Sequence, residues 1–278
     1  EAPELTLQDL LPMAAEKYPE RTALVMTLAA AGRLFSYPVS YRRLQRDVER
    51  FAASLQGLGV QPGDRVALYL PNCPQFVIAA YGTWRAGGIV VCCNPLYVGR
   101  EVQHLVNDSG AETFVVMSSL YERLKGIRAN TGLKRAIVTN VKEYFPPVLK
   151  LLFTMAKEKK EGHRVNIASD ADTWWLQDLL RGAPPRPAPV DVAPEDVSTL
   201  IYTGGTTGSP KGAQLTHRNL VSNAKMLCLW NQAHEAQDVM LAVMPYFHSY
   251  GLTVGMNVPI ASALTMVQIP NPRDMPHV

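Results

Sequence analysis

Val197-Ser198-Thr199-Leu200-Ile201-Tyr202 leads directly into Thr203-Gly204-Gly205-Thr206-Thr207-Gly208-Ser209-Pro210-Lys211-Gly212. The first six residues form a short, largely apolar run, which predicts a strand. The ten residues that follow hold four glycines, three threonines, one serine and one lysine. Glycines let backbone N–H groups turn toward an anion without obstruction by a Cβ atom. Hydroxyls add donors or a ligand for a hard cation, and Lys211 adds positive charge. The stretch therefore predicts a phosphate-binding loop.

The residues around this loop separate it from two alternatives. One alternative is a flexible Gly/Thr hairpin with no chemical role. That alternative would be favoured if the sequence offered only an isolated G-x-G. The other is the P-loop of common NTPases, which requires Gly-Lys-Ser/Thr at the start of a helix. Here Lys211 stands between Pro210 and Gly212. Ala213-Gln214-Leu215 then predicts a returning strand, and the next helix is expected only over Asn219–Trp230. An ordinary P-loop NTPase is therefore disfavoured.

The stretch Tyr202–Gly212 closely resembles the signature of the adenylate-forming superfamily, which includes acyl-CoA synthetases, luciferases and peptide-synthetase adenylation domains. The usual signature has serine where this chain has Gly204, so one hydroxyl donor is lost. Thr216-His217-Arg218-Asn219-Leu220 extends the resemblance. The resemblance implies that the loop binds the β- and γ-phosphates of ATP, with the Thr203 hydroxyl next to Mg²⁺.

A second match follows in Met244-Pro245-Tyr246-Phe247-His248-Ser249-Tyr250-Gly251-Leu252. In this family a Pro-x-x-His-x-x-Gly segment lines the space between the acyl pocket and the ATP site. The resemblance implies that His248 faces the reacting carboxylate and that Gly251 leaves room for the acyl chain. As isolated residues, His248 fits a core or surface imidazole equally well, and Tyr246 and Phe247 fit core aromatics. No acidic residue follows His248 through Met256, which favours an apolar acid over an amino acid and leaves an aryl acid open.

Other stretches narrow the resemblance to the bacterial long-chain fatty-acid ligases. These stretches are Leu70–Phe76, Arg85–Val91, Asn94–Tyr97 and Ile269–Asp274, and they are interpreted as mostly scaffold. The resemblance covers essentially the whole chain. It implies an ATP-dependent enzyme that converts a long-chain fatty acid to acyl-AMP and then to acyl-CoA, with ATP, Mg²⁺ and coenzyme A. A homodimer is left open.

The resemblance also implies a set of site residues. The resemblance assigns catalytic roles to Thr203, Lys211 and His248, and it makes Thr203 the expected metal ligand. Nucleotide binding falls on Tyr202, Thr203, Gly204, Gly205, Thr206, Thr207, Gly208, Ser209 and Lys211. Binding of the acyl substrate falls on Tyr246, Phe247, His248 and Gly251.

The chain before the loop alternates between strand-like and helix-like segments. Strands are predicted at Arg21–Leu28, Arg65–Leu70, Ile89–Cys93, Thr113–Met117 and Arg135–Thr139, and helices at Leu7–Tyr18, Ser40–Leu55, Pro74–Ala86, Arg100–Asn107 and Tyr121–Arg128. This rhythm predicts an α/β fold of layered, mostly parallel sheets with helices on both faces. It would be the incomplete N-terminal domain of the adenylate-forming fold. A Pro-rich connector at 184–193 predicts two units, 1–183 and 194–278.

One segment, Tyr144–Arg164, interrupts the alternation. Val148–Ala156 is apolar but far shorter than the roughly 20 residues that span a bilayer, and lysines follow it. One interpretation is an amphipathic element on a membrane surface, with the lysines meeting anionic head groups. The other is an exposed excursion that packs on the same domain.

Composition excludes some classes of protein. The 27 basic and 24 acidic residues are interspersed, so no basic stripe of a nucleic-acid binder is present and no nucleic-acid partner is expected. The four cysteines form no C-x-x-C pair, which favours buried, reduced thiols in a cytoplasmic protein, with contact to the inner face of the membrane left open. No secretory signal is visible in the first residues, and because the chain does not begin with Met a removed one is left open.

Several expected parts of the superfamily are absent from this sequence: its Tyr-Gly-x-Thr-Glu stretch, its ribose-binding aspartate, its hinge and its C-terminal lysine domain. The chain is therefore expected to be an N-terminal fragment that is inactive alone. Two rival functions remain: a non-catalytic scaffold that has kept the loop, and a sibling enzyme that activates an aryl acid or an amino acid.

Overall fold

Two β-sheets organise the chain, and the structure, a computed structural model, describes residues 4–30, 33–203 and 210–270. The larger sheet runs in the order β7 (Thr173–Trp175), β6 (Arg135–Thr139), β5 (Thr113–Met117), β3 (Arg65–Tyr69), β4 (Ile89–Cys92), β8 (Val197–Thr203) and β9 (Lys211–Thr216). The smaller sheet runs β10 (Val239–Ala242), β11 (Thr265–Gln268), β1 (Thr22–Ala30) and β2 (Arg33–Ser40). Described strand pairs are parallel except β1–β2 and β8–β9, which confirms the mostly parallel prediction.

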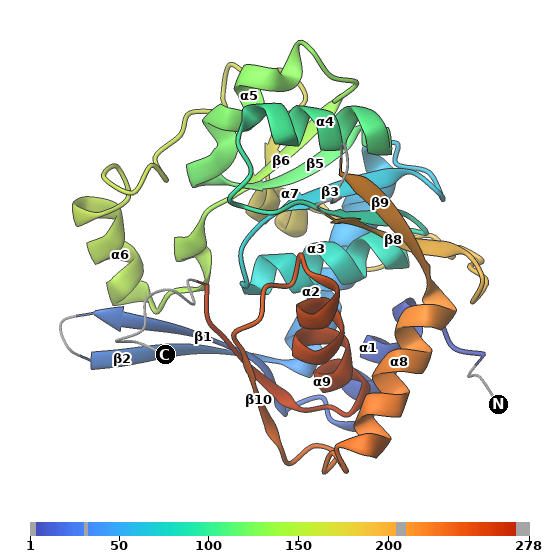
Figure 1. Cartoon of the computed structure of the whole chain (residues 1–278). Coiled ribbons are helices and arrows are strands. Elements are labelled where there is room, and N and C mark those ends of the chain that lie inside the picture. The colour runs from blue at the N-terminus through green and yellow to red at the C-terminus, as the bar shows by residue number, and fades with distance from the viewer. Residues whose placement is uncertain (1–3, 31–32, 204–209, 271–278) are drawn as a thin grey trace.

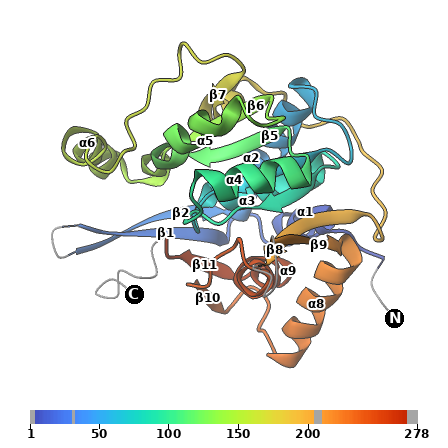
Figure 2. The ribbon, with the colours of Figure 1, turned by 45° about the horizontal axis from the view of Figure 1, so that its top comes forward.

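Helices connect the strands and cover the sheets (Figures 1 and 2). They are α1 (Leu7–Lys17), α2 (Tyr41–Gly57), α3 (Pro74–Arg85), α4 (Gly99–Ser109), α5 (Tyr121–Arg128), α6 (Pro147–Ala156), α7 (Leu176–Gly182), α8 (His217–Trp230) and α9 (Val258–Ala261). Short helical turns lie at η1 (Ser118–Leu120) and η2 (Val141–Tyr144), and the π-helical segment η3 (Gly251–Asn257) precedes α9.

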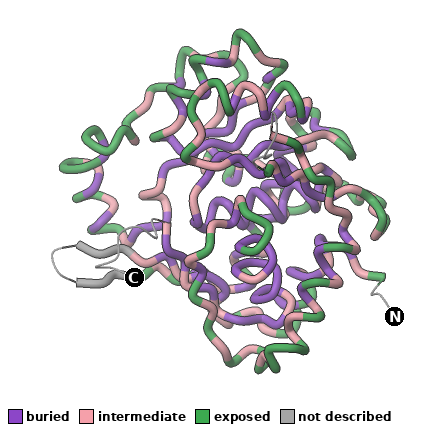
Figure 3. Tube along the Cα trace, in the orientation of Figure 1, coloured by how far each residue is buried: buried purple, intermediate pink, exposed green. Residues whose placement is uncertain are grey.

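The central strands of the larger sheet bury both of their faces. Val66 and Leu68 of β3 face the cluster that holds α2 and α3, whereas Ala67 and Tyr69 face the cluster that holds α4 and α5. This alternation follows from the two-residue period of a strand. Because helices cover both faces, the strands read as continuous apolar runs, as expected of a parallel sheet. Figure 3 shows the buried residues gathered along this central layer.

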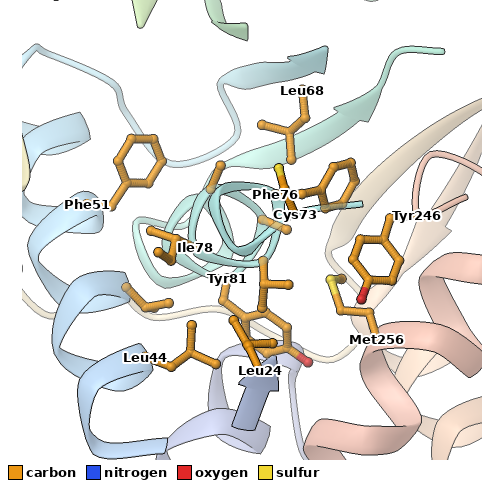
Figure 4. Packing of buried hydrophobic residues seen from close by; sticks show 14 of the residues in the cluster. Leu24, Leu44, Phe51, Leu68, Cys73, Phe76, Ile78, Tyr81, Tyr246 and Met256 are labelled. Carbon is orange, nitrogen blue, oxygen red and sulfur yellow. The ribbon is translucent and has the colours of Figure 1, made fainter. Parts of the chain in front are cut away.

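Helix α3 lies between the two sheets and is buried along nearly its whole length. Phe76, Ile78 and Tyr81 of α3 belong to one cluster with Leu44 and Phe51 of α2, Leu24 of β1 and Met256 of η3, as Figure 4 shows. A helix that is apolar on all sides can only be stable inside the core. The cluster therefore joins the smaller sheet to the larger one.

The sequence predicted several local elements with accuracy. The strands at Thr113–Met117 and Arg135–Thr139 and the helix at Tyr121–Arg128 have the predicted bounds. Ser40 caps α2 by accepting a hydrogen bond from the Arg43 N–H at 3.3 Å. The predicted return strand after the loop is β9, and the expected helix is α8, which begins two residues earlier, at His217.

The connector at 184–193 has neither helix nor strand in the structure, as its prolines predict. Strands on its two sides nevertheless share both sheets, because β8 pairs with β4 and β11 pairs with β1. The division into units 1–183 and 194–278 stays a prediction, and the described strands show the two stretches interleaved.

All four cysteines are free, and Cys73, Cys92 and Cys93 are buried as predicted. Cys228 is half-buried near the end of α8, where its sulfur lies 3.8 Å from the Val258 carbonyl oxygen and 3.0 Å from the Ser262 hydroxyl. Burial raises the pKa of the Cys73 thiol to about 12, so this thiol stays protonated and inert at neutral pH. A cytoplasmic location stays a prediction.

Candidate active site

The stems of the glycine-rich loop form an antiparallel pair at the end of the larger sheet. Thr203, the last residue of β8, pairs directly with Lys211, the first residue of β9, and both are exposed. The pair therefore places a hydroxyl and an ammonium group beside each other at the base of the loop. The remaining predicted loop residues, Gly204, Gly205, Thr206, Thr207, Gly208 and Ser209, lie outside the described residues.

Helix α4 holds both stems of the loop through two polar side chains. The Tyr202 hydroxyl donates to Asp108 Oδ2 at 2.6 Å, and His104 Nε2 lies 3.2 Å from the Pro210 carbonyl oxygen. The carbonyl can only accept, so this contact places a proton on Nε2. Burial, followed by the bond to Asp108, raises the pKa of the Tyr202 phenol, which therefore remains a donor. The contacts tie the ends of the loop to a helix of the rigid core.

Tyr202 also restricts the backbone of the opposite stem. Its ring lies against Gly212, its partner in the strand pair, where a Cβ atom would come within 3.1 Å of the ring carbons. Glycine at 212 thus has a packing role besides any role in the loop. The predicted contact of Tyr202 with the nucleotide stays a prediction, and the structure shows that this side chain contacts Asp108 and Gly212.

The second motif is held by a side chain that lies about 170 residues earlier in the sequence. Asn72, which is buried, donates through Nδ2 to the carbonyl oxygens of Ala242 at 3.0 Å and Met244 at 2.9 Å. Its Oδ1 accepts from the Tyr246 N–H at 2.8 Å. Both Nδ2 donors and the Oδ1 acceptor of the Asn72 amide are therefore paired with the backbone of one segment. Asn72 positions the segment that leads to His248.

Backbone packing explains the glycine of this motif. A Cβ atom on Gly251 would lie 2.0 Å from the carbonyl oxygen of Pro245 and 2.7 Å from that of Met244. Only glycine permits this approach between the start of η3 and the preceding turn. The predicted role of Gly251 in leaving room for an acyl chain stays a prediction, and this close contact is a second reason for glycine.

The aromatic residues of the motif are placed differently from each other. Tyr246 is fully buried, its ring centroid is 5.4 Å from that of Phe76, and its hydroxyl accepts from Gln268 Nε2 at 3.3 Å. Phe247 is partly buried against the same core. These are the positions of core aromatics, the alternative that the residues alone left open. Their contact with a substrate stays a prediction.

His248 lies at the surface, where the chain turns from this segment into the helical run that contains η3. Its Nδ1 accepts from the Tyr250 N–H at 3.3 Å, and its backbone N–H donates to the Pro245 carbonyl at 3.1 Å. Because Nδ1 accepts, the proton of the neutral ring lies on Nε2. An exposed imidazole with a fixed tautomer is suited to donate a hydrogen bond to a carboxylate or phosphate oxygen.

The strand order brings the two motifs to one edge of the molecule. β3, β4 and β8 are neighbours and run parallel, so their carboxyl ends meet at the same edge. Asn72 follows β3 by a short turn, and Thr203 ends β8. In open α/β sheets ligands bind outside the carboxyl ends of the strands. The segment held by Asn72 and the Thr203–Lys211 pair therefore lie at the edge where a ligand is expected.

A metal ion at this edge of the sheet would have few protein ligands. Among residues 4–30, 33–203 and 210–270 no group of three or more His, Cys, Asp or Glu side chains could hold a metal. Mg²⁺ often takes only one or two protein ligands and completes its shell with water and phosphate oxygens. The exposed Thr203 hydroxyl beside Lys211 fits such a site.

Sequence reasoning missed three residues that support the site. Asn72 was interpreted as scaffold, and His104 and Asp108 drew no attention. The signal for Asn72 was its position between two prolines after a strand, where a short polar side chain can reach neighbouring backbone. Nothing local marked His104 or Asp108, because their partners lie about a hundred residues later in the chain.

The fold and this edge together define the N-terminal domain of an adenylate-forming enzyme. A long-chain-fatty-acid-CoA ligase from Archaeoglobus fulgidus superposes with a TM-score of 0.78 at 28% sequence identity, over 97% of this chain and 48% of that one. Residues 11–278 match the family described as AMP-binding enzyme. The chain belongs to this family.

Several curated relatives are named long-chain-fatty-acid–CoA ligase, and one from Oryza sativa subsp. japonica is named 4-coumarate–CoA ligase-like 9. A long-chain-fatty-acid–CoA ligase of Bacillus subtilis (strain 168) is 32% identical over 271 residues, which is 96% of this chain and 47% of the relative. One from Yersinia pestis is 36% identical over 242 residues, which is 86% of this chain and 43% of the relative. The chain thus spans about half the length of the curated relatives it matches.

Proposed function

We propose that this chain is the N-terminal part of an ATP-dependent long-chain fatty-acid–CoA ligase. The observation that carries the proposal is the Thr203–Lys211 pair at the carboxyl edge of the sheet, which is also the edge where Asn72 holds the second motif. The names of the matched ligases and the match to the AMP-binding enzyme family support the same activity. A homodimer stays a prediction.

The proposed reaction has two steps. A fatty carboxylate attacks the α-phosphorus of ATP, the bond to the bridging oxygen of pyrophosphate breaks, and acyl-AMP forms. The thiol of coenzyme A then attacks the acyl carbonyl, loses its proton and displaces AMP. The first step joins two anions, so the protein must offset charge and hold the carboxylate in line with the leaving group.

The residues of this chain divide that task. Lys211 and the Thr203 hydroxyl offset charge on the β- and γ-phosphates, together with the backbone N–H groups of the loop. His248 Nε2 donates to the reacting carboxylate and orients it. Thr203 would hold Mg²⁺, which supplies charge neutralisation on the phosphate oxygens when bound. His104 and Asp108 keep the loop stems in place by their contacts with Pro210 and Tyr202.

Replacing Thr203 in the full-length parent protein tests this assignment. Loss of one charge-stabilising donor removes about 3–4 kcal/mol of transition-state stabilisation, so Thr203→Ala should slow pyrophosphate release by a factor of 10² to 10³. Thr131→Ala is the matched control, because the Thr131 hydroxyl contacts only the Arg128 carbonyl among the described residues, remote from the loop. Near-normal pyrophosphate release by Thr203→Ala would contradict the role given to Thr203.

A panel of carboxylic acids tests the substrate class. Pyrophosphate exchange with acids from acetate to oleate, plus a cinnamate, should be fastest with the long alkyl acids. A maximum with the cinnamate would identify an aryl-acid ligase instead.

Absence of ATP binding in both the presence and absence of fatty acid would favour a non-catalytic scaffold. We also propose that the 278-residue chain binds nucleotide weakly and does not turn over. Acyl-CoA formation by the purified chain would contradict this.

A further inference from the structure

Helix α6 exposes a row of large apolar side chains. Val148, Leu151, Leu152 and Met155 are 70%, 60%, 55% and 76% exposed, respectively. They occur at intervals of three, four and seven residues, so they lie on one side of the helix. We call these four residues the α6 stripe. Single exposed apolar residues are normal on a protein surface, but a continuous row of them marks an interaction site.

The opposite side of α6 is anchored in the protein, which fixes the direction of the stripe. Leu149 and Phe153 are buried, and the Phe153 ring lies 5.3 Å from the ring of Phe145 in an edge-on contact. Just beyond the helix, the buried Glu158 pairs with Lys142 at 2.5 Å and accepts from Asn140 Nδ2 at 2.9 Å. These contacts hold the helix against the segment that follows β6 and contains η2, and the stripe therefore points outward.

The charge around the stripe is unbalanced. Residues 142–164 hold six lysines and arginines but three glutamates, an excess of three that equals the excess of the whole chain. Two of the glutamates, Glu143 and Glu158, pair with Lys150 and Lys142. Lys159 and Lys160 are exposed at the end of the helix that the stripe approaches. An apolar stripe next to basic side chains matches the surface of an anionic bilayer.

A second exposed apolar surface provides a contrast. Leu229 and Trp230 at the end of α8 are 80% and 84% exposed, but no run of lysines accompanies them. Figures 1 and 2 both place α6 and α8 on opposite sides of the molecule. No helix among the described residues is long and apolar enough to cross a membrane, so a membrane contact through α6 would be a surface contact.

We propose that α6 docks this protein on the surface of an anionic phospholipid bilayer. The stripe enters the boundary between head groups and acyl chains, and Lys159 and Lys160 contact the lipid phosphates. This contact needs neither ATP nor a turnover, so its test stands apart from the proposed ligase activity.

Vesicle flotation of the 278-residue chain tests the proposal. The probes are vesicles of phosphatidylcholine with about one third phosphatidylglycerol, and vesicles of phosphatidylcholine alone. The chain should float with the anionic vesicles, and the double variant Leu151→Asp with Met155→Asp should lower its partition coefficient by about tenfold or more. Lys159→Gln with Lys160→Gln should lower it by about tenfold on anionic vesicles and remove most of its salt dependence.

Leu229→Asp is the matched control, because it makes the same change on the other exposed apolar surface and should leave flotation unchanged. All variants alter exposed side chains, so circular dichroism and thermal unfolding should match the parent chain. Equal flotation of the parent and the Leu151/Met155 variant would overturn the proposal. So would a stripe-dependent self-association in sedimentation without vesicle binding, because it would identify a second copy of the chain as the occupant.

Discussion

Replacement of Gly251 by alanine is the most direct test of how the second motif is built. The new Cβ atom would lie 2.0 Å from the Pro245 carbonyl oxygen, 2.5 Å from the Pro245 carbonyl carbon and 2.7 Å from the Met244 carbonyl oxygen. Ordinary contacts of this kind are about 3.5 Å apart, so the turn and η3 must separate by roughly 1 Å or more. The obstructing atoms belong to the backbone and cannot rotate away.

The expected cost follows from this overlap. Overpacking typically costs about 1–3 kcal/mol, and an obstacle of fixed backbone beside the buried Gly251 belongs at the upper end. Separation of the turn would also strain the three hydrogen bonds of Asn72 with the same segment. We therefore expect Gly251→Ala to lower the free energy of unfolding by about 3 kcal/mol, a large fraction of the stability of a typical protein.

Urea unfolding of the 278-residue chain, followed by tryptophan fluorescence, measures this loss. With a slope of about 3 kcal/mol per molar urea, the midpoint should fall by about 1 M. Gly126→Ala is the matched control, since Gly126 is exposed within α5 and its Cβ would meet nothing within 4 Å. Removing glycine from an open helix position should stabilise the chain by about 0.5–1 kcal/mol.

Two outcomes would refute this reasoning. A loss of less than about 1 kcal/mol in Gly251→Ala would mean that the turn relaxes without strain. An equal loss in Gly126→Ala would mean that alanine harms the chain for reasons unrelated to backbone contact. If Gly251 serves only to leave room for an acyl chain, the variant should unfold like the parent and differ only in its choice of acid.

Three further predictions concern contacts that cross the molecule. Asn72→Ala leaves two carbonyls and one N–H of the segment without their partner and should lower the free energy of unfolding by about 3 kcal/mol, measured by the same urea assay. Asp108→Ala removes the acceptor of the Tyr202 hydroxyl and should weaken ATP binding by the full-length protein about tenfold, measured by calorimetry, with little change in stability because the pair is exposed. Burial lowers the pKa of His217 from 6.5 to about 4, so between these pH values the unfolded chain binds a proton that the folded chain does not. Stability should therefore fall as the pH decreases through this window, by on the order of 3 kcal/mol, and His217→Gln should flatten that slope in unfolding experiments at successive pH values.

Each of these three predictions has a clear contrary result. Normal unfolding of Asn72→Ala would show that solvent satisfies the segment's backbone. Unchanged ATP affinity in Asp108→Ala would show that the loop stems need no support from α4. An unchanged pH slope in His217→Gln would assign the acid sensitivity to other groups, of which His163, whose pKa is also lowered by burial, is one.

Local patterns in the sequence determined much of this protein. A short apolar run and the helical spacing of apolar residues placed Thr113–Met117 and Tyr121–Arg128 correctly, because each element is decided by neighbours within a short window. The same is true of the Ser40 cap and of β9 as the return strand. The sequence also predicts the chemistry of the loop, since glycines, hydroxyls and a lysine favour phosphate wherever the loop is placed.

Tertiary structure decided the features that depend on distant partners. Asn72 holds a segment about 170 residues away, and β1 pairs with β11 from the other end of the chain. Leu149 and Leu151 are both leucines of α6, yet packing buries the first and exposes the second. Gly251 is required because another backbone segment passes within contact distance. The sequence alone specified the local elements, and it predicts the kind of site. The assembled sheets decided which side chains hold the segments around that site, because such contacts exist only after long-range packing has brought them together.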